Sequence, residues 1–376
     1  MRDRKEIARA RARLNAVIRE TLGARGYLEV ETPCLVPAPG MEPHITAFES
    51  EFAPELGDVP ARRLYLHSSP EYAMKRLLAE GMGHVFTICK AFRNGEAAAA
   101  HNPEFTMLEH YRSPGSSFEV MADLEAIVHA AAEERWATSG APLAAPFERL
   151  TVREAFAREG LVVPEDEDAF FRLFLDRIEP ALGRRAPTFL VDWPGSMAAL
   201  ARLKPDGTAD RFELYAGGLE LANGFGELND AVEQRRRLVH EQAQRRAAGR
   251  PVYPLDERFL EAVGRMPPSG GVAVGLDRLL MLLVGAEKIE DVLLFPAVSE
   301  WRSPAPQADD RSSLRCSSAG SERRMRSSAA RSISASATPI PSGQQARTVP
   351  QGSTIIERPQ VRRLPGCSPN WAGART

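Results

Sequence analysis

The sequence has 376 residues, an apolar fraction of 43% and a formal net charge of −2. This apolar fraction is typical of a soluble globular protein, and no apolar run reaches the roughly 20 residues needed to cross a bilayer. The charge is divided unevenly: residues 301–376 hold 12 Arg, no Lys and four acidic residues, a net charge of +8, so residues 1–300 carry −10. An acidic body of this kind argues against a general nucleic-acid-binding protein.

The four cysteines are scattered and form no CxxC pair or Cys/His cluster, so neither a structural zinc site nor a disulfide framework is predicted. The first 20 residues include Asp3, Glu6 and Glu20 and lack an apolar core, which argues against a secretory signal. We therefore expect a protein of the reducing cytoplasm.

Apolar residues recur at helical spacing from Ile7 to Leu22, and Gly26 ends that pattern, which predicts a first helix. Further helices are predicted at 70–79, 118–137, 231–248 and 277–284, and strands at 27–31, 64–69, 85–92, 105–112, 189–193, 212–215, 219–225 and 271–276. The strands are grouped and do not alternate strictly with helices. This grouping favours an α+β fold with a mostly antiparallel sheet flanked by helices over a doubly wound parallel sheet.

The composition changes near Trp301. Residues 301–376 are rich in Arg, Ser and Pro, contain no Phe and hold few large aliphatic residues. Such a segment cannot bury enough apolar surface to offset the entropy lost on ordering. We therefore divide the chain into a folded domain at 1–300 and a disordered tail at 301–376. The tail is open to three readings: an Arg/Ser interaction segment, a solvated tail, or an out-of-frame translation of a GC-rich gene.

Three patches of the folded domain stand out, and the second and third carry residues suited to nucleotide chemistry. The first, RGYLEVETP (25–33), is a helix end followed by a strand and a proline. The second, FRNGEAAAAHNPEFTMLE (92–109), is a hairpin in which Arg93 suits an α-phosphate, because a guanidinium stays charged and binds bidentately. Phe105 on its return strand suits a flat base. The third, GGVAVGLDRLLMLL (270–283), is a glycine-rich strand that lets a ligand approach closely and leads into a helix with Arg278.

A fourth stretch, RFELYAGGLELANGFGELND (211–230), contains Glu213, Glu220 and Glu227 at intervals of seven residues. On extended or bulged strands, we expect these carboxylates to point into one cavity. Hard oxygen ligands of this kind suit Mg²⁺ held between protein and triphosphate, and a remaining carboxylate suits a ligand ammonium group. The GxGxxG and GxxxxGK[ST] patterns are both absent, so any ATP site is not of the Rossmann or P-loop type.

In this order the three patches resemble the three signature motifs of class II aminoacyl-tRNA synthetases. The 211–230 stretch, with SSPEYAMKRLL (68–78) and HNPEFTMLEHY (101–111), narrows the resemblance to the lysyl-tRNA synthetase catalytic domain. Residues 1–297 look most like a family of truncated paralogues that attach β-lysine to translation elongation factor P. Two features favour the paralogues. The sequence has no room before the first motif for an anticodon-binding barrel, and Ser69 stands in the amino-acid pocket where the synthetase usually has alanine.

The resemblance implies two catalytic residues. Arg93 would hold the α-phosphate of ATP and stabilise charge as the carboxylate attacks, and Arg278 would hold the distal phosphates. His101 would contact the triphosphate, and Phe105 would stack on adenine. The other nucleotide-binding residues that it implies are Asn102, Glu220, Leu221 and Gly275.

The resemblance also implies an acidic pocket for a diamino acid, since a dicationic ligand needs paired charges once desolvated. Ser69 and Glu71 would receive one amino group of this substrate. The residues that would surround its side-chain ammonium are Glu109, Tyr111, Asn223 and Glu227. Mg²⁺ would be held by Glu213 and Glu220.

The implied reaction needs no protein nucleophile. (R)-β-Lysine and ATP give an aminoacyl-adenylate and pyrophosphate, and a lysine amine of elongation factor P then displaces AMP to form an amide. Positioning and electrostatics supply most of the catalysis. A homodimer formed through the first motif is expected, with no tRNA or membrane partner.

The hairpin loop departs from the family pattern. Relatives usually carry glycine or arginine in this loop, often with an arginine where this chain has Ala100, and a glutamate that reads adenine where it has Gly95. Loss of one phosphate contact is expected to cost about 1.5–3 kcal/mol of nucleotide binding. We therefore expect a working loop with weaker ATP affinity.

Three other functions remain open. A lysyl-tRNA synthetase would aminoacylate transfer RNA. A non-catalytic binding or regulatory paralogue is suggested by Ala97–Ala100 and by the unusual tail. An ammonia-using asparagine synthetase would share the fold, but the LANGFGEL stretch argues against it.

Overall fold

The computed structural model describes residues 3–55, 60–137, 143 and 146–301. Its α-helices are α1 (Arg4–Ala24), α2 (Glu71–Ala79), α3 (Ser117–Ala132), α4 (Val152–Arg158), α5 (Glu167–Leu173), α6 (Ala231–Ala247), α7 (Glu257–Val263), α8 (Leu276–Val284) and α9 (Ala297–Glu300). The other helical turns are the π-helix η1 (Phe174–Ile178) and the 3₁₀ turns η2 (Glu179–Ala181), η3 (Gly195–Met197) and η4 (Ile289–Val292).

The centre of the fold is an eight-stranded sheet with the strand order β1-β5-β6-β11-β10-β9-β8-β7. Its strands are β1 (Leu28–Glu29), β5 (Val85–Phe92), β6 (Glu104–Arg112), β7 (Glu148–Thr151), β8 (Thr188–Trp193), β9 (Ala209–Ala216), β10 (Leu219–Gly226) and β11 (Gly270–Gly275). The outer pairs β1–β5 and β7–β8 are parallel, and all pairs between them are antiparallel. The predicted α+β fold with a mostly antiparallel sheet is therefore confirmed.

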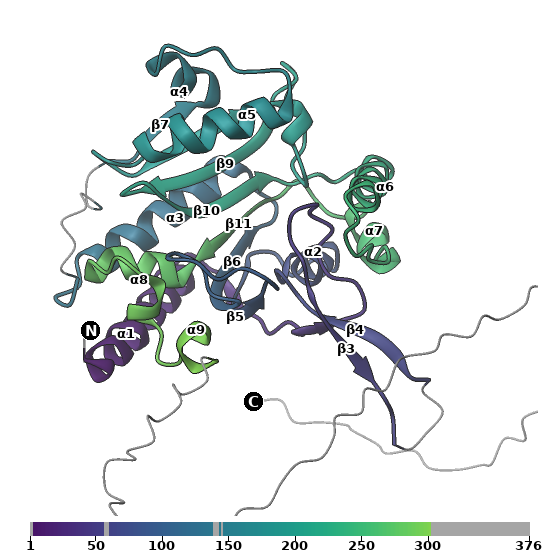
Figure 1. The fold of residues 1–376 in the computed structure, drawn as a ribbon, viewed down its shortest axis with the longest axis horizontal. Coiled ribbons are helices and arrows are strands. Elements are labelled where there is room, and N and C mark those ends of the chain that lie inside the picture. The colour runs from purple at the N-terminus through teal and green to yellow at the C-terminus, as the bar shows by residue number, and fades with distance from the viewer. Residues whose placement is uncertain (1–2, 56–59, 138–142, 144–145, 302–376) are drawn as a thin grey trace, which may run out of the picture. The chain divides into compact units, whose positions relative to one another are not determined.

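A second, small sheet consists of β2 (Leu35–Val36), β4 (Arg62–Leu66) and β3 (Phe48–Phe52). Figure 1 shows β3 and β4 as a hairpin that projects away from the main sheet. Four of the five residues of β3 are exposed, so this hairpin adds little to the core.

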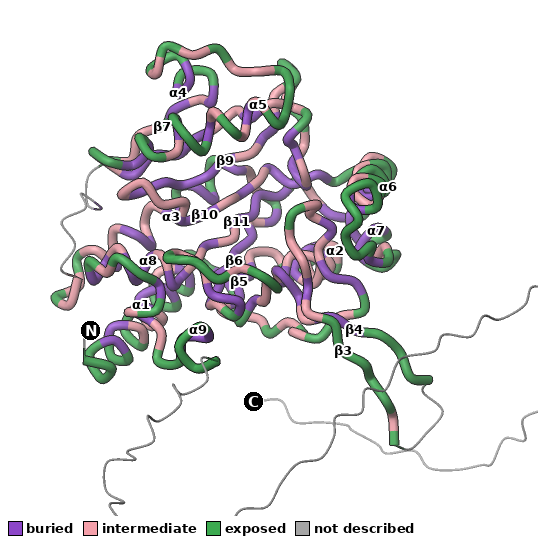
Figure 2. The backbone as a smooth tube through the Cα atoms, in the orientation of Figure 1, coloured by how far each residue is buried: buried purple, intermediate pink, exposed green. Residues whose placement is uncertain are grey.

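One layer of helices covers a face of the central sheet. In Figure 1, α1, α3 and α8 gather on this face, and Leu14, Leu124 and Leu280 from the three helices are completely buried in the main core. A second core lies where α4 and α5 meet β8 and includes Phe156, Phe170 and Trp193. Figure 2 shows the strands of the central sheet as mostly buried, so the strands that carry the site belong to the interior of the domain.

The predicted elements agree with the structure to different degrees. The strand predicted at 85–92 coincides with β5, and the predicted helices at 70–79, 231–248 and 277–284 differ from α2, α6 and α8 by one residue. The strand predicted at 27–31 is too long, because only Leu28 and Glu29 form β1 at the sheet edge.

The sequence analysis missed several short elements: β2, β3, β7, α4, α5, α7, α9 and the η turns. The expected disordered tail at 301–376 lies outside the described residues except for Trp301. Within the described residues, no helix has both the length and the apolar character required to cross a membrane.

Candidate active site

The β5–β6 hairpin places the residues of the second motif. The two strands pair from Val85 opposite Tyr111 to Phe92 opposite Glu104. The Arg93 amide then donates to Pro103 O (2.9 Å), so the pairing continues into the loop. The Arg93 guanidinium lies 5.1 Å from the centre of the Phe105 ring, and its Nη1 is 3.8 Å from Glu96 Oε1. The Arg93 guanidinium and the Phe105 ring therefore lie next to each other at the loop end of the β5–β6 hairpin.

The third motif consists of β11 and α8, and it places Arg278 of α8 next to the hairpin loop of the second motif. Arg278 Nη1 donates to Glu220 O (2.8 Å), and Nη2 donates to His101 Nε2 (2.7 Å). Burial, followed by the charge of Arg278, lowers the pKa of His101, and a neutral imidazole is the form that accepts this hydrogen bond. Strands β10 and β11 and the hairpin loop thus converge on one guanidinium.

The side chain before Arg278 fixes this arrangement. Asp277 is 2% exposed, and its Oδ2 accepts from the Thr106 amide (2.6 Å), while Oδ1 pairs with Arg11 of α1. Thr106 follows Phe105 on β6. One buried carboxylate therefore holds the ring of the second motif and the guanidinium of the third motif in register.

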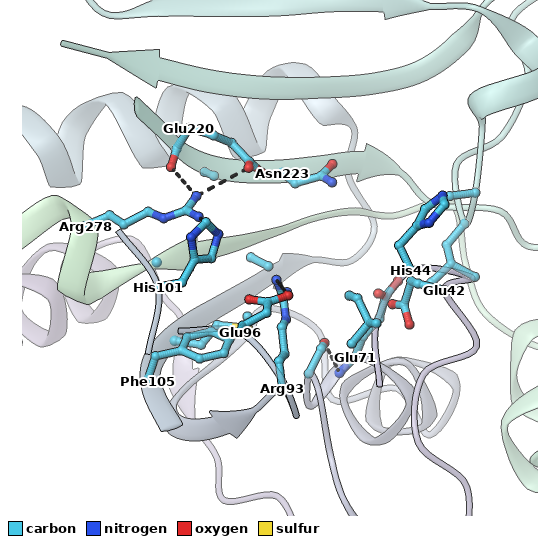
Figure 3. Close-up of a pocket in the computed structure, with 18 of the residues that line it drawn as sticks. Glu42, His44, Glu71, Arg93, Glu96, His101, Phe105, Glu220, Asn223 and Arg278 are labelled. Atoms are coloured by element: carbon cyan, nitrogen blue, oxygen red, sulfur yellow. Dashed lines mark hydrogen bonds and ion pairs between the residues drawn. The ribbon is translucent and has the colours of Figure 1, made fainter. Parts of the chain in front are cut away.

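A cavity of about 370 Å³ is lined by Arg93, His101, Phe105 and Arg278. Figure 3 shows Arg278, His101 and Glu220 on one side of the cavity and Glu42, His44 and Glu71 on the other, with Arg93 and Glu96 between them. The site residues predicted from sequence that line the cavity are Ser69, Glu71, Arg93, His101, Asn102, Phe105, Glu220, Leu221, Asn223, Gly275 and Arg278. The cavity therefore has a cationic, aromatic end and an acidic end.

Gly275 and Asn102 shape the cationic end in different ways. A Cβ atom at Gly275 would meet its nearest neighbour at 3.8 Å, so the missing side chain leaves open space. The Asn102 side chain is tied into the fold: Nδ2 donates to Glu104 O (2.5 Å), and Oδ1 accepts from the Ala297 amide (3.0 Å). In this structure Asn102 orders the loop that it belongs to.

The alanine loop is held by its main chain. Ala98 and His101 form an isolated β-bridge, Ala99 O accepts from the Ile289 amide (2.8 Å), and Ala100 O accepts from Arg278 Nε (3.3 Å). Ala100 lines the cavity, whereas Ala97 to Ala99 are exposed. The loop keeps its shape without charged side chains, but its methyl groups offer a phosphate nothing to bind.

The expectation that three glutamates point into one cavity is wrong in part, because only Glu220 lines it. Glu213 is 4% exposed, and its carboxylate accepts from the Arg211 guanidinium and from the Tyr215 hydroxyl. Burial raises the pKa of Glu213 to about 7, with Arg211 opposing the shift and Glu220 adding to it. A register shift between Glu220 and Ala222 leaves Glu213 opposite Asn223.

These contacts bear on the Mg²⁺ site that was predicted at Glu213 and Glu220. No group of three His, Cys, Asp or Glu side chains with metal-binding geometry occurs among the described residues. Glu220 fits a Mg²⁺ ligand because its carboxylate faces the cavity. Glu213 fits only if its carboxylate exchanges Arg211 or Tyr215 for the ion.

At the acidic end, Glu109 is completely buried behind Ser69. Its Oε1 accepts from Ser69 Oγ (2.5 Å), and its Oε2 accepts from the Tyr111 hydroxyl (2.8 Å). Burial and then the charge of Glu71 raise the pKa of Glu109 to about 8. Neither Glu109 nor Tyr111 lines the cavity, so both lie one layer behind its wall.

A buried ion cluster completes this end. Lys75 of α2 is completely buried, and its Nζ lies 2.6 Å from Glu71 Oε1 and 2.6 Å from Glu227 Oε2. Burial raises the pKa of Glu227 to about 8, whereas Lys75 acts in the opposite direction. Two of the carboxylates predicted to bind substrate therefore share one internal cation.

A sequence profile of the family described as tRNA synthetases class II (D, K and N) matches residues 1–299. This chain belongs to that family.

Within this class II family, curated relatives from Salmonella gallinarum, Salmonella paratyphi B and Salmonella schwarzengrund are each 40% identical to the chain over 305 residues. Each alignment covers 76% of this chain and 93% of the relative. All three relatives are named elongation factor P–(R)-β-lysine ligase. The resemblance predicted from the three motifs is confirmed.

The sequence reasoning missed some residues of this class II site. Lys75 has one sequence signal, its position four residues after Glu71 on a predicted helix. Glu42 and Glu241 line the acidic end and have no such signal. Burial raises the pKa of both carboxyls, to about 8 for Glu241. The acidic end thus extends beyond the stretch at 211–230.

Proposed function

We propose that this chain activates (R)-β-lysine with ATP and transfers it to a lysine side chain of translation elongation factor P. The observation that carries the proposal is the two-ended cavity: Arg278, His101 and Phe105 stand at one end, and Ser69 and Glu71 stand in front of buried Glu109 at the other. A nucleotide needs the first set of groups, and a diamino acid needs the second. The names of the relatives supply the particular amino acid and acceptor.

In the first step a substrate carboxylate oxygen forms a bond to the α-phosphorus of ATP, and the bond to the β-phosphate oxygen breaks. This step releases pyrophosphate. Arg93, held against Phe105, would neutralise charge on the α-phosphate, and Arg278 would bind the distal phosphates. To do so, Arg278 exchanges His101 or the Glu220 carbonyl for phosphate oxygens.

In the second step an unprotonated lysine amine of the acceptor attacks the carbonyl carbon of the adenylate. A C–N bond forms, the bond to AMP breaks, and the amine loses a proton. The protein supplies positioning and electrostatics, since no side chain becomes covalently attached. Mg²⁺, when bound by Glu220 and Glu213, would offset the negative charge of the triphosphate.

The acidic end would select the substrate by charge. Asn223 lines the cavity, and Glu109, Tyr111 and Glu227 lie directly behind its wall. A neutral side chain of similar length would bring no positive charge to this desolvated cluster, whose carboxylates outnumber its internal cation Lys75, which is a costly arrangement. We therefore assign the two amino groups of the substrate to this end.

We further propose that the active form is a homodimer in the cytoplasm. β1, the strand of the first motif, forms one edge of the central sheet, and its Leu28 is 57% exposed. An exposed edge with a large apolar side chain is suited to pairing with a second subunit.

The transfer step tests this proposal against its alternatives. The purified chain, ATP, Mg²⁺ and (R)-β-lysine are incubated with elongation factor P, and the acceptor is examined by intact mass spectrometry. We expect a mass increase of one β-lysyl group, which requires ATP. Aminoacylation of transfer RNA in a parallel reaction, without modified acceptor, would instead identify a lysyl-tRNA synthetase.

A further inference from the structure

Lys75 is a cation within the acidic end, and its charge opposes the substrate that this end is proposed to bind. Its side chain is 0% exposed, and it lies on α2, one turn after Glu71. Its other partner, Glu227, follows β10 and is 1% exposed. The lysine therefore joins a helix to the end of a central strand in the floor of the site.

An ammonium ion without solvent is stable only where charge and hydrogen bonds compensate for lost hydration. The two oxygens at 2.6 Å provide this compensation. Burial alone would lower the pKa of Lys75, but Glu227 and Glu71 raise it above its usual value. Lys75 is thus a permanent cation in this structure.

The carboxylates depend on Lys75 in turn. Without it, Glu71 and Glu227 would face each other as like charges in a site shielded from water, beside Glu109, whose pKa is already raised by burial and by Glu71. Such carboxyls take up protons or move apart, and either change removes an acceptor for an ammonium group.

The contacts also leave binding capacity unused. Lys75 approaches one oxygen of each carboxylate, Glu71 Oε1 and Glu227 Oε2. Glu227 Oε1 has no hydrogen-bond partner in the described structure and lies next to Gly271, where an added Cβ would approach it to 2.3 Å. Each carboxylate therefore keeps one oxygen that Lys75 does not contact.

We propose that Lys75 is a positioning residue for the amino-acid substrate: its ammonium fixes Glu71 in the cavity wall and Glu227 behind it, so that the substrate's amino groups meet a preformed carboxylate cluster. This inference rests on the proposed function, because it assigns the second partner of those carboxylates to a diamino acid. Lys75 does not touch the substrate. It determines substrate affinity and leaves nucleotide binding unchanged, since Arg278, which would bind the distal phosphates, lies on the opposite side of the cavity from Glu71.

The test is the Lys75→Met variant, which keeps the length of the side chain and removes its charge. In β-lysine-dependent ATP–pyrophosphate exchange, we expect KM for β-lysine to rise by about 30-fold or more, with a smaller change in kcat. The Kd for ATP, measured by calorimetry without amino acid, should stay within about twofold of the parent, which also reports that the variant is folded. Lys75→Arg, which restores the cation, should recover part of the affinity.

The matched control is Lys90→Met, which removes a lysine that is 47% exposed and pairs with Glu104 on the surface. It should leave both constants unchanged. If Lys75→Met does not fold, Lys75→Gln removes the charge but keeps a hydrogen-bond donor between the two carboxylates, and a KM increase is likewise expected from it.

An unchanged KM in a folded variant that lacks the Lys75 cation would overturn the inference and leave Lys75 a structural role only. A parent chain that shows no exchange with any diamino acid would remove the proposed function, and this inference with it. An active parent with unaffected lysine variants contradicts the inference alone, so the two failures are distinguishable.

Discussion

Arg278 Nη2 donates to His101 Nε2 over 2.7 Å, which joins the last signature motif directly to the alanine-containing loop of the second. The same guanidinium also bonds the main-chain oxygens of Glu220 and Ala100. Arg278 is therefore already directed into the cavity, and phosphate oxygens can replace neutral partners without a large movement of the side chain. This preorganisation is what electrostatic catalysis requires.

Replacing Arg278 with alanine should lower kcat/KM for ATP in the exchange reaction by about 10²–10³-fold, the range for loss of one preorganised donor in an active site. The free energy of unfolding should change little, because the side chain remains 19% exposed and its partners regain water. Arg278→Lys should recover only part of the activity, since an ammonium does not reproduce the guanidinium fork. A variant with parental kcat/KM would show that Arg278 does not bind the phosphates.

The Ala100→Arg substitution should strengthen ATP binding. Ala100 lines the cavity next to Arg278, so a guanidinium there can reach the distal phosphates that the alanine side chain cannot bind. A gain of about 1.5 kcal/mol corresponds to about tenfold lower KM for ATP. The control is Ala97→Arg, whose exposed position adds the same charge outside the cavity. Equal effects of both variants would indicate general electrostatic attraction and not a restored contact.

The pH dependence of stability should report Glu109. Burial and Glu71 raise its pKa in the folded protein to about 8, whereas an unfolded glutamate has a pKa of about 4.3. Between these values the folded state holds a proton that the unfolded state has lost, so stability falls as pH rises through this window.

We therefore expect the free energy of unfolding to fall from pH 5 to pH 8, by up to about 1.4 kcal/mol per pH unit from Glu109 alone. Glu213 and Glu241 shift in the same direction and add to the slope. Glu109→Gln should reduce this slope by the contribution of Glu109, as measured by urea denaturation at a series of pH values. An unchanged slope would mean that Glu109 is ionised in the fold throughout this range.

Asp277 should be important for stability. Its carboxylate is 2% exposed and holds the Thr106 amide and Arg11. Asp277→Asn keeps the shape but removes the charge that Arg11 needs, and breaking a buried pair costs about 3–5 kcal/mol. Urea denaturation should show this loss. Glu290→Gln, in an exposed pair with Lys288 (3.7 Å), should change stability by less than about 1 kcal/mol.

The elements predicted best from the sequence have a strong apolar periodicity. Among the strands, these are the ones that pair with a neighbouring strand on each side. β5, between β1 and β6, coincides with its prediction, whereas β1 pairs on one side only and is shorter than predicted. β3 was missed because most of its side chains are exposed and give no apolar alternation.

The site was predicted best where one residue type suits one chemistry. Arg93, Phe105 and Arg278 come together as their motifs suggest. Lys75 was missed because a lysine four residues after a glutamate usually marks a solvent-exposed helix pair, whereas in the fold its side chain is completely buried between Glu71 and Glu227. Glu213 lies opposite Asn223 on the cavity face of the sheet, but spacing alone does not reveal that Arg211 and Tyr215 bind its carboxylate.

The most direct test of the proposed function is amino-acid-dependent ATP–pyrophosphate exchange by the full chain with Mg²⁺. (R)-β-Lysine, α-lysine and aspartate are compared, with Glu227→Ala as the control variant. We predict strong exchange with (R)-β-lysine, weak exchange with α-lysine, none with aspartate, and loss of exchange in the control. No exchange with any of the three at saturating ATP would contradict this prediction and make the alanine loop the leading explanation for an inactive site.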